Sequence, residues 1–286
     1  MNKPDHSAVV SVPVKKFDHA CISSADDVVA VEEPLAIRLT WPQADGSKHV
    51  VRDIAVTMRT PGHDKELALG FLFTEGILLS ADQVVQVTRP VGDDEGDDAN
   101  NIIIVELNDL PALTADQLER NFFITSSCGI CGKASIDAIR THAQFDVRGD
   151  EFMMSAEMLA ALPELLATGQ ETFAGTGSVH AAALFSPEGL CSEVYEDIGR
   201  HNAVDKLIGA KLCADSLPLW NMGLFVSGRS SFELVQKARM AGCAMLAAVG
   251  APSSLAVELA WESDMTLVGF VRDGRFNVYA GPARIA

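Results

Sequence analysis

The sequence lacks any apolar run approaching the roughly 20 residues that a helix needs to cross a bilayer. Its first residues, from Met1 to Asp18, also lack an apolar stretch of signal-peptide length ahead of their charges. These two absences predict a cytoplasmic protein that makes no use of a membrane. We expect residues 1–27 to form a mobile polar leader.

Basic residues are also scarce, because 22 Lys and Arg stand against 39 Asp and Glu, for a net charge of -17. Nucleic acids and anionic membranes attract proteins with basic surfaces. The composition therefore argues against bulk binding to either. It leaves room for one small anionic ligand held in a locally positive pocket, and it favours basic protein partners.

Cysteines number only six in 286 residues. A disulfide framework is not expected in a chain of this size without a secretion signal. Only Cys128 and Cys131 are close in sequence. Cys213 and Cys243 lie in apolar helical surroundings and Cys191 precedes an expected strand, so we predict that these three pack in the core.

Hydrophobic residues make up 48% of the chain and charged residues 21%, a balance typical of folded globular proteins. Residues 28–121 are expected to form a smaller, β-rich lobe of α+β type. Its predicted elements are strands at 28–31, 35–40, 50–58 and 102–107, a turn at 45–46, a helix from an Asp64 N-cap to Gly76, an acidic loop at 92–101 and a short helix at 113–120.

Residues 122–286 differ, because short apolar strands there end in small polar loops that each open a helix. Such alternation is typical of an α/β layer with helices on a mixed sheet. The junctions lie at 122–140, 195–206, 224–242 and 247–260, with a helix near 155–166, a strand at 180–185 and a closing hairpin at 266–279. The predicted fold class is therefore α/β, with a mixed-sheet second lobe.

The sharpest feature is the segment TSSCGICGK, which contains Cys128 and Cys131. The pair stands where a helix is expected to begin, so backbone N–H groups and the helix dipole favour a thiolate there. Lys133 adds a positive charge, and such surroundings lower a cysteine pKa from about 8.5 into the range of roughly 3.5–7.5. The two glycines of the segment permit the mobile loop that a carrier thiol needs.

A Cys-x-x-Cys pair serves zinc binding, thiol–disulfide exchange or sulfur transfer. A structural zinc site needs four ligands, and the chain lacks a second such pair or a downstream His-x(3–5)-His. Redox exchange is less favoured because the pair lies far inside the chain and no aromatic residue precedes it. Sulfur transfer fits best, and a zinc-stabilised adaptor remains an alternative without a complete ligand set.

Three polar loops stand at expected element starts: GTGSV before His180, GRHN around His201 and SGRSS around Arg229. Ser230 and Glu233 have the spacing of a capping box. Each loop alone is more typical of an ordinary capped helix or of a satisfied loop or buried histidine than of a ligand site. Together they predict a polyanionic ligand across the strand ends, held by helix N-termini and arginines.

Six segments together make the chain resemble the formate dehydrogenase accessory sulfurtransferases, the FdhD/NarQ family, from about Glu32 to Arg284. The segments are EEPL from Glu32, TMRTPG from Thr57, ELALGFLFTEGI from Glu66, SSCGICGK from Ser126, EDIGRHNAVDK from Glu196 and SGRSSFE from Ser227. This set is far more specific than a single Cys-x-x-Cys pair.

The resemblance implies that a cysteine desulfurase passes persulfide sulfur to Cys128, assisted by Cys131. The chain then transfers this sulfur to the molybdenum bis-(molybdopterin guanine dinucleotide) cofactor before its insertion into the formate dehydrogenase catalytic subunit. The cofactor is thus a bound substrate, and neither a resident cofactor nor a metal is implied. The expected cofactor-binding residues are Phe276, Asn277, Val278, Tyr279, Ala280 and Gly281, to which the polar loops add Arg229 and His201.

The resemblance also implies a homodimer and a cytidine-deaminase-like fold for residues 122–286. The deaminase zinc signature is absent from the sequence, so deamination is not implied. One alternative function remains, a non-catalytic chaperone that binds the molybdenum cofactor and its target enzyme. A chaperone should tolerate serine at Cys128, whereas a carrier should not.

Overall fold

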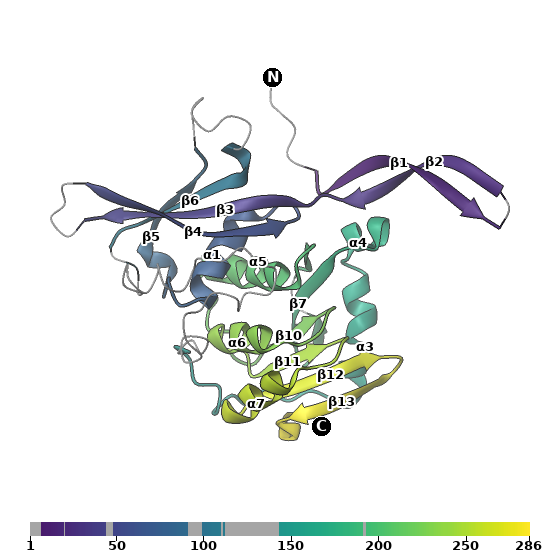
Figure 1. Ribbon diagram of the computed structural model, residues 1–286. Helices are drawn as coiled ribbons and strands as arrows, with labels where there is room; N and C mark the ends of the chain where they lie inside the picture. Colours follow the sequence, from purple (N-terminus) through teal and green to yellow (C-terminus); the bar gives the residue numbers. More distant parts are fainter. Residues whose placement is uncertain are drawn as a thin grey trace.

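The computed structural model describes residues 7–19, 21–43, 48–90, 99–109, 111, 143–190 and 193–286. Within them, a two-stranded hairpin, a four-stranded sheet and a seven-stranded sheet follow one another along the chain. Figure 1 shows helices α1 (Asp64–Thr74) and α5 (Arg200–Cys213) between the two larger sheets. The arrangement is a mixed α/β fold, as predicted.

The hairpin consists of β1 (Val9–Asp18) and β2 (Cys21–Ala30), paired without interruption from Val9–Ala30 to Asp18–Cys21. Closely spaced valines favour extended backbone in both strands. Figure 1 shows this hairpin projecting sideways from the rest of the molecule. The mobile polar leader predicted for residues 1–27 is therefore wrong from Val9 onward, where the chain forms regular strands.

The four-stranded sheet has the order β4-β3-β6-β5. Its strands are β3 (Glu33–Pro42), β4 (His49–Arg59), β5 (Val84–Thr88) and β6 (Ile102–Leu107), with the 3₁₀ turn η1 (Ala81–Gln83) ahead of β5. In β3 every second side chain is buried, from Leu35 to Trp41, so one face of the sheet is closed by the core. The predicted strands at 35–40, 50–58 and 102–107 are confirmed.

Helix α1 begins one residue earlier than the sequence predicts, because its N-cap is residue 63 and not residue 64. His63 is the N-cap, in the left-handed region at φ 56°, and no side chain caps the helix. The carboxylate of Asp64 instead binds the buried guanidinium of Arg59, with Nε–Oδ1 at 3.0 Å and Nη2–Oδ2 at 3.2 Å. A buried arginine in the preceding strand thus takes the carboxylate that the capping prediction used.

The seven-stranded sheet has the order β13-β12-β11-β10-β7-β8, and β9 pairs with β7. Its strands are β7 (His180–Ser186), β8 (Gly189–Leu190), β9 (Tyr195–Asp197), β10 (Gly223–Val226), β11 (Met245–Ala248), β12 (Thr266–Arg272) and β13 (Arg275–Ala280). Strands β10, β11 and β12 are parallel and the remaining pairs antiparallel, so the sheet is mixed. Every residue of β10 and β11 is buried, as befits central strands covered on both faces.

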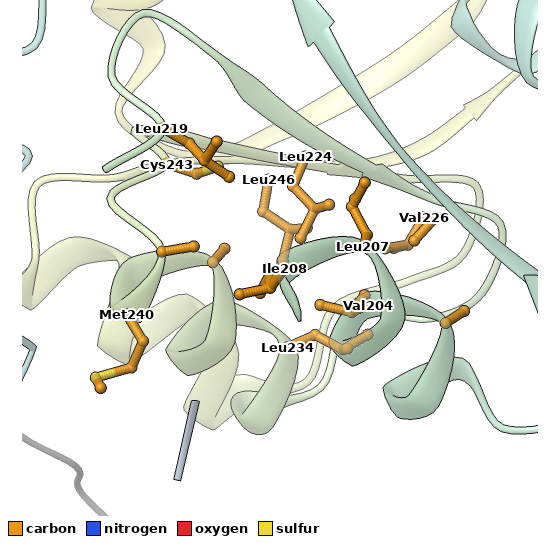
Figure 2. Packing of buried hydrophobic residues seen from close by; sticks show 14 of the residues in the cluster. Val204, Leu207, Ile208, Leu219, Leu224, Val226, Leu234, Met240, Cys243 and Leu246 are labelled. Atoms are coloured by element: carbon orange, nitrogen blue, oxygen red, sulfur yellow. The ribbon is translucent and has the colours of Figure 1, made fainter. Parts of the chain in front are cut away.

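The remaining helices are α3 (Ala156–Ala167), α4 (Glu171–Thr176), α6 (Phe232–Met240) and α7 (Ser254–Glu262), and the 3₁₀ turn η4 (Pro282–Arg284) closes the chain. Figure 2 shows Val204, Leu207 and Ile208 of α5 packed against Leu224 of β10 and Leu246 of β11. All five side chains are at most 1% exposed. The helices therefore hold the sheet through one continuous apolar layer.

Helices α1 and α5 touch backbone to backbone where two glycines meet. A Cβ added to Gly70 would lie 1.9 Å from the backbone oxygen of Asp205, and one on Gly209 would lie 1.9 Å from that of Glu66. No side chain larger than hydrogen fits at either position. This contact joins the four-stranded sheet and the seven-stranded sheet into one body.

A buried ion pair strengthens the same junction. Lys237 Nζ of α6 lies 2.8 Å from Asp205 Oδ1 of α5 and 2.8 Å from Thr74 Oγ1 at the end of α1. Burial alone would lower the pKa of Lys237, but the carboxylates of Asp205 and Glu75 raise it overall. The lysine therefore stays charged and ties three helices together.

The cysteine predictions are confirmed in one case and wrong in another. Cys243 is 1% exposed and packs in the core, but Cys213 is exposed at the end of α5. Cys213 is the last residue of α5 and lies outside the buried face of the helix. Its apolar neighbours in the sequence did not reveal this. Cys191 lies outside the described residues.

Among the described helices, none combines the length and the apolar character that a membrane crossing requires. The likeness of the second part of the chain to the cytidine deaminase fold stays a prediction. The boundary predicted near residue 121, the turn at 45–46 and the helix at 113–120 lie outside the described residues.

Candidate functional site

Cys128, Cys131 and Lys133 belong to residues 112–142, which lie outside the described part of the chain. The site is therefore built from the polar loops and from the last strand, which the sequence singled out separately.

The three polar loops meet at the start of β7. A Cβ on Gly228 would lie 3.3 Å from His180 Nδ1 and 3.5 Å from Arg200 Cδ. The loop before β7, the loop before α5 and the loop before α6 thus converge on one small region. The structure thus brings the three polar loops together, while the polyanionic ligand expected there stays a prediction.

The loop after β11 joins this region from the other side. Gly250 donates its N–H to Gly228 O at 2.9 Å, and a Cβ on Gly250 would lie 2.9 Å from Arg229 Cα. Ser230 N donates to Ala251 O at 3.1 Å. Since parallel strands β10 and β11 end here, their loops form adjacent walls of one site, as ligand sites in α/β sheets do.

Neither helix that starts at the site is capped by a side chain. The N-caps are Gly199 for α5 and Ser231 for α6. The capping box predicted from Ser230 and Glu233 is therefore wrong by one residue. Ser231 Oγ lies 3.1 Å from His201 Nε2. This hydroxyl therefore interacts with the imidazole ring and does not cap the helix. Helix starts without side-chain caps offer backbone N–H groups to an anion.

His201 is held as a neutral ring. Burial, followed by the nearby charges of Arg200 and Lys237, lowers its pKa to about 3. Glu233 Oε2 lies 3.7 Å from Nε2, but burial and the cations still leave the pKa well below its ordinary value. A neutral imidazole offers a hydrogen bond to a ligand without adding a charge that titrates near neutral pH.

His180 is half-buried near Arg200 and Gly228. Burial and the Arg200 guanidinium lower its pKa, and the carboxylate of Asp197 partly opposes them. Both histidines of the site are thus biased toward the neutral form. The positive charge at the site comes from arginine.

Two buried polar atoms at the site have no hydrogen-bond partner within the described part of the chain, Arg200 Nε and Ser230 Oγ. Leaving such atoms unpaired costs about 1–3 kcal/mol each. A ligand that supplies acceptors here would recover that energy. The unused donors therefore fit an anionic or strongly polar ligand.

The loop that carries Arg200 and His201 rests on a buried ion pair. Asp197 Oδ2 lies 2.8 Å from Lys206 Nζ, and both side chains are at most 1% exposed. Lys206 also donates to Thr60 O at 2.9 Å, and Asp197 Oδ2 accepts from Thr60 N at 3.2 Å. The segment after β4 thereby fixes the start of α5.

Asn202 makes a second link between these segments. Its amide nitrogen donates to Met58 O at 2.7 Å and to Asp197 Oδ1 at 3.1 Å. Its amide oxygen accepts from Thr57 Oγ1 at 3.1 Å. The motifs TMRTPG and EDIGRHN lie about 140 residues apart in the sequence. Together they hold the loop that carries Arg200 and His201 in place.

The last strand reaches the site through Tyr279. The register of β12 and β13 pairs Leu267 with Ala280 and then Val268 with Val278, so Tyr279 is the extra residue of a β-bulge. A Cβ on Gly269 would lie 3.1 Å from Tyr279 Cε2 and also 3.1 Å from Gly250 O. The bulge therefore aims the tyrosine ring toward the loop after β11.

The other residues predicted on this strand divide into two groups. Phe276, Asn277 and Val278 are exposed or half-exposed, and Asn277 Nδ2 lies 3.4 Å from the Tyr279 hydroxyl. Ala280 is 1% exposed, and Gly281 has φ 56° and a carbonyl that accepts from Thr266 Oγ1 at 2.6 Å. The side chain of Ala280 is therefore structural and Phe276 packs partly against the core, while Asn277 and Val278 are exposed.

Sequence patterns missed the supporting residues Asp197, Lys206 and Asn202, and also Ser230 as an unpaired hydroxyl. The one available signal was a charged residue, Lys206, among apolar neighbours on a helix otherwise expected to be buried. In the described residues, no three His, Cys, Asp or Glu side chains come together as a metal site would require.

Comparison with known proteins shows which family the chain is similar to. Residues 30–286 match the model of the FdhD/NarQ family. A "Sulfur carrier protein FdhD" of Streptomyces avermitilis is 48% identical over 276 residues, which cover 96% of this chain and 94% of that protein. A protein of the same name from Saccharolobus solfataricus is 37% identical and covers 96% of this chain and all of its own length.

A solved structure has the same fold. The crystal structure of a putative formate dehydrogenase accessory protein from Desulfotalea psychrophila superposes with a TM-score of 0.70, covering 98% of this chain and 100% of that one at 23% identity. Together with the family match over nearly the whole length, this places the convergent loops on a known scaffold. The chain belongs to the FdhD/NarQ family.

Proposed function

We propose that this chain is a sulfur carrier for formate dehydrogenase maturation. Cys128 accepts sulfane sulfur from the persulfide of a cysteine desulfurase, with Cys131 assisting. The chain then transfers this sulfur to a molybdenum bis-(molybdopterin guanine dinucleotide) cofactor, its bound substrate, before the catalytic subunit of formate dehydrogenase receives it. The reaction takes place in the cytoplasm, and the chain works as a homodimer.

The observation that carries the proposal is the meeting of His180, Arg200 and Gly228 at one sheet edge, with Tyr279 beside the next loop. A dinucleotide carries pyrophosphates, which suit the uncapped helix starts and the guanidinium of Arg200. A flat ring system suits contact with Tyr279. The relatives that share this scaffold are themselves named sulfur carriers.

Each sulfur transfer breaks one sulfur–sulfur bond and forms another bond to the same sulfur. The Cys128 thiolate attacks the outer sulfur of the desulfurase persulfide, and the desulfurase cysteine leaves as a thiolate. In the second transfer Cys128 is the leaving thiolate. The acceptor metal supplies the two electrons that convert sulfane sulfur into sulfide.

The test is to incubate the protein with a cysteine desulfurase and L-cysteine, and to record intact and peptide mass spectra with and without reductant. We expect a reductant-labile gain of one sulfur atom on the Cys128 peptide, absent in Cys128→Ser. Cys243→Ser is the matched control, because that thiol is buried and should leave the adduct unchanged. No adduct, despite an active desulfurase and free thiols, would overturn the carrier function in favour of a cofactor-binding chaperone.

A further inference from the structure

The hairpin β1–β2 is an arm whose main contact with the rest of the described chain is between β2 and helix α4. Its strands form a separate two-stranded sheet, and Figure 1 shows them extending away from the body. An isolated two-stranded hairpin is only marginally stable in water. We therefore expect a regular arm of this length to pack against another surface.

The tip of the arm carries an apolar pair. Phe17 and Ile22 face each other across the ladder and are 73% and 64% exposed. Directly paired side chains lie on the same face of a hairpin, so the two form one apolar knob. Lys15 and Lys16 precede this knob, on a chain whose net charge is -17. An apolar knob with neighbouring lysines suits an apolar patch on an acidic protein.

The same chain carries an apolar patch at the root of the arm. Val56 and Met58 of the edge strand β4 are 45% and 44% exposed. Thr57 between them points inward to Asn202, so both apolar side chains lie on the outward face. Their ladder partners on β3 are Ala36 and Pro34, which extend the patch.

An arm cannot cover the patch at its own root. Strand β2 continues into β3 through only Val31 and Glu32, and Phe17 lies eight residues beyond Val9 at the root. At about 3.3 Å per residue, the knob stands roughly 26 Å from that root. Within the described residues, these two exposed apolar surfaces of one chain lie too far apart to meet, but they can meet between two copies.

We infer that the arm of one copy docks its Phe17–Ile22 knob on the Val56–Met58 patch of a second copy, and that the second copy returns the contact. Such an exchange is a two-fold, self-complementary interface. It rests on the homodimer of the proposed function but not on the sulfur chemistry, which the mass-spectrometric test decides separately.

The area available agrees with a stable dimer. One face of an arm measures about 33 Å by 10 Å, or roughly 330 Å². This is well below the roughly 800 Å² per partner of a standard interface. Reciprocal docking buries two arm faces and two patches, roughly 1,300 Å² in total, which lies within the range of specific interfaces. A single one-way contact would be too small.

The first test is sedimentation equilibrium of the full chain from 1 to about 100 µM. Phe17→Thr/Ile22→Thr removes the knob, and Val56→Thr/Met58→Gln removes the patch, with β-forming or unbranched side chains retained. We expect each double variant to weaken the dimer at least tenfold. Val85→Thr is the control, since Val85 is 56% exposed on the opposite edge strand and should not change association.

A second test locates the contact directly. Cys21, an exposed free thiol beside Ile22 in sequence, is a natural probe at the arm tip. With a short bifunctional thiol reagent, Met58→Cys should give several-fold more covalent dimer than Val85→Cys. Equal yields from these two variants, a monomeric wild-type chain, or a dimer that survives both double variants would each overturn the exchange. A monomer would leave a different protein as the occupant of the arm.

Discussion

His201 is largely buried beside Arg200 and Lys237, and this burial, followed by the two charges, lowers the pKa of its ring. Its folded pKa of about 3 lies below the ordinary value near 6.5. The unfolded chain therefore binds more protons between pH 6.5 and 3, and the folded state loses stability as the pH falls through that window. The histidine helps stability only while it is neutral.

We predict that His201→Gln reduces the acid sensitivity of the protein. The wild-type chain should lose about 2 kcal/mol through this residue between pH 7 and pH 5, and glutamine, which does not titrate, should abolish that share while keeping a hydrogen bond to Ser231. The measurement is urea unfolding of both proteins at the two pH values. An equal loss in both proteins would show that His201 is already protonated near pH 6.5.

Arg200 leads to a prediction about binding. If its guanidinium holds a phosphate of the ligand, Arg200→Met should weaken GDP binding by about 1.5–3 kcal/mol, since hydrogen bonds to charged groups contribute that much. Isothermal titration with GDP and with guanosine measures the effect. Lys211→Met on the same helix is the control, and a variant that loses GDP and guanosine affinity equally would argue against phosphate recognition.

Helices α1 and α5 depend on two positions where no side chain fits. Gly70→Ala places a methyl group 1.9 Å from a backbone oxygen, so the helices must separate. We predict a loss of at least about 3 kcal/mol in the free energy of unfolding, the scale of severe core disruption. Chemical denaturation measures it. Gly175→Ala, in α4 with open space around it, should change stability by less than about 1 kcal/mol.

At this scale most elements of the chain were predictable. Strands such as β3 alternate buried and exposed residues, and β10 and β11 are short apolar runs between turn residues, so pattern alone identifies them. The start of α1 was mispredicted because Asp64 serves Arg59 rather than the helix. The local sequence predicts a helix cap at Asp64. It does not reveal that Arg59, in the preceding strand, competes for the same carboxylate.

The arm was missed for a different reason. Residues 9–30 mix valines with lysines, serines and aspartates, and no core side distinguishes the two faces. A strand pair that is exposed over most of its length leaves little hydrophobic periodicity to detect. Likewise Tyr279 joins the site through a β-bulge, which depends on the register between β12 and β13 rather than on sequence spacing.

For the molecule as a whole, the decisive contacts lie between segments about 140 residues apart. Lys206 and Asp197 join the start of α5 to Thr60, so the four-stranded sheet positions the loops of the other sheet. The sequence marks both segments as motifs of one family. Their mutual contact follows only from the packing of α1 on α5.

We predict that Lys206→Met destabilises the protein by about 3–5 kcal/mol, because it leaves the Asp197 carboxylate buried without its cation. Adding Asp197→Asn should recover part of that loss, since the second change removes the unpaired charge. Thermal and urea unfolding of the three proteins measure both effects. If the double variant is as unstable as the sum of the two single variants, the pair is not coupled.

The glycine contact between α1 and α5 has a consequence for how the chain can be divided. Each helix supplies the surface that the other lacks, so the two sheets should not fold as separable modules. Residues 1–111 and 112–286, produced as two polypeptides, should each fail to fold alone and should reassemble when co-expressed. If one half were replaced by an unrelated domain, the other half would lose the surface on which it folds. We therefore expect the two halves to be inherited together as a single unit.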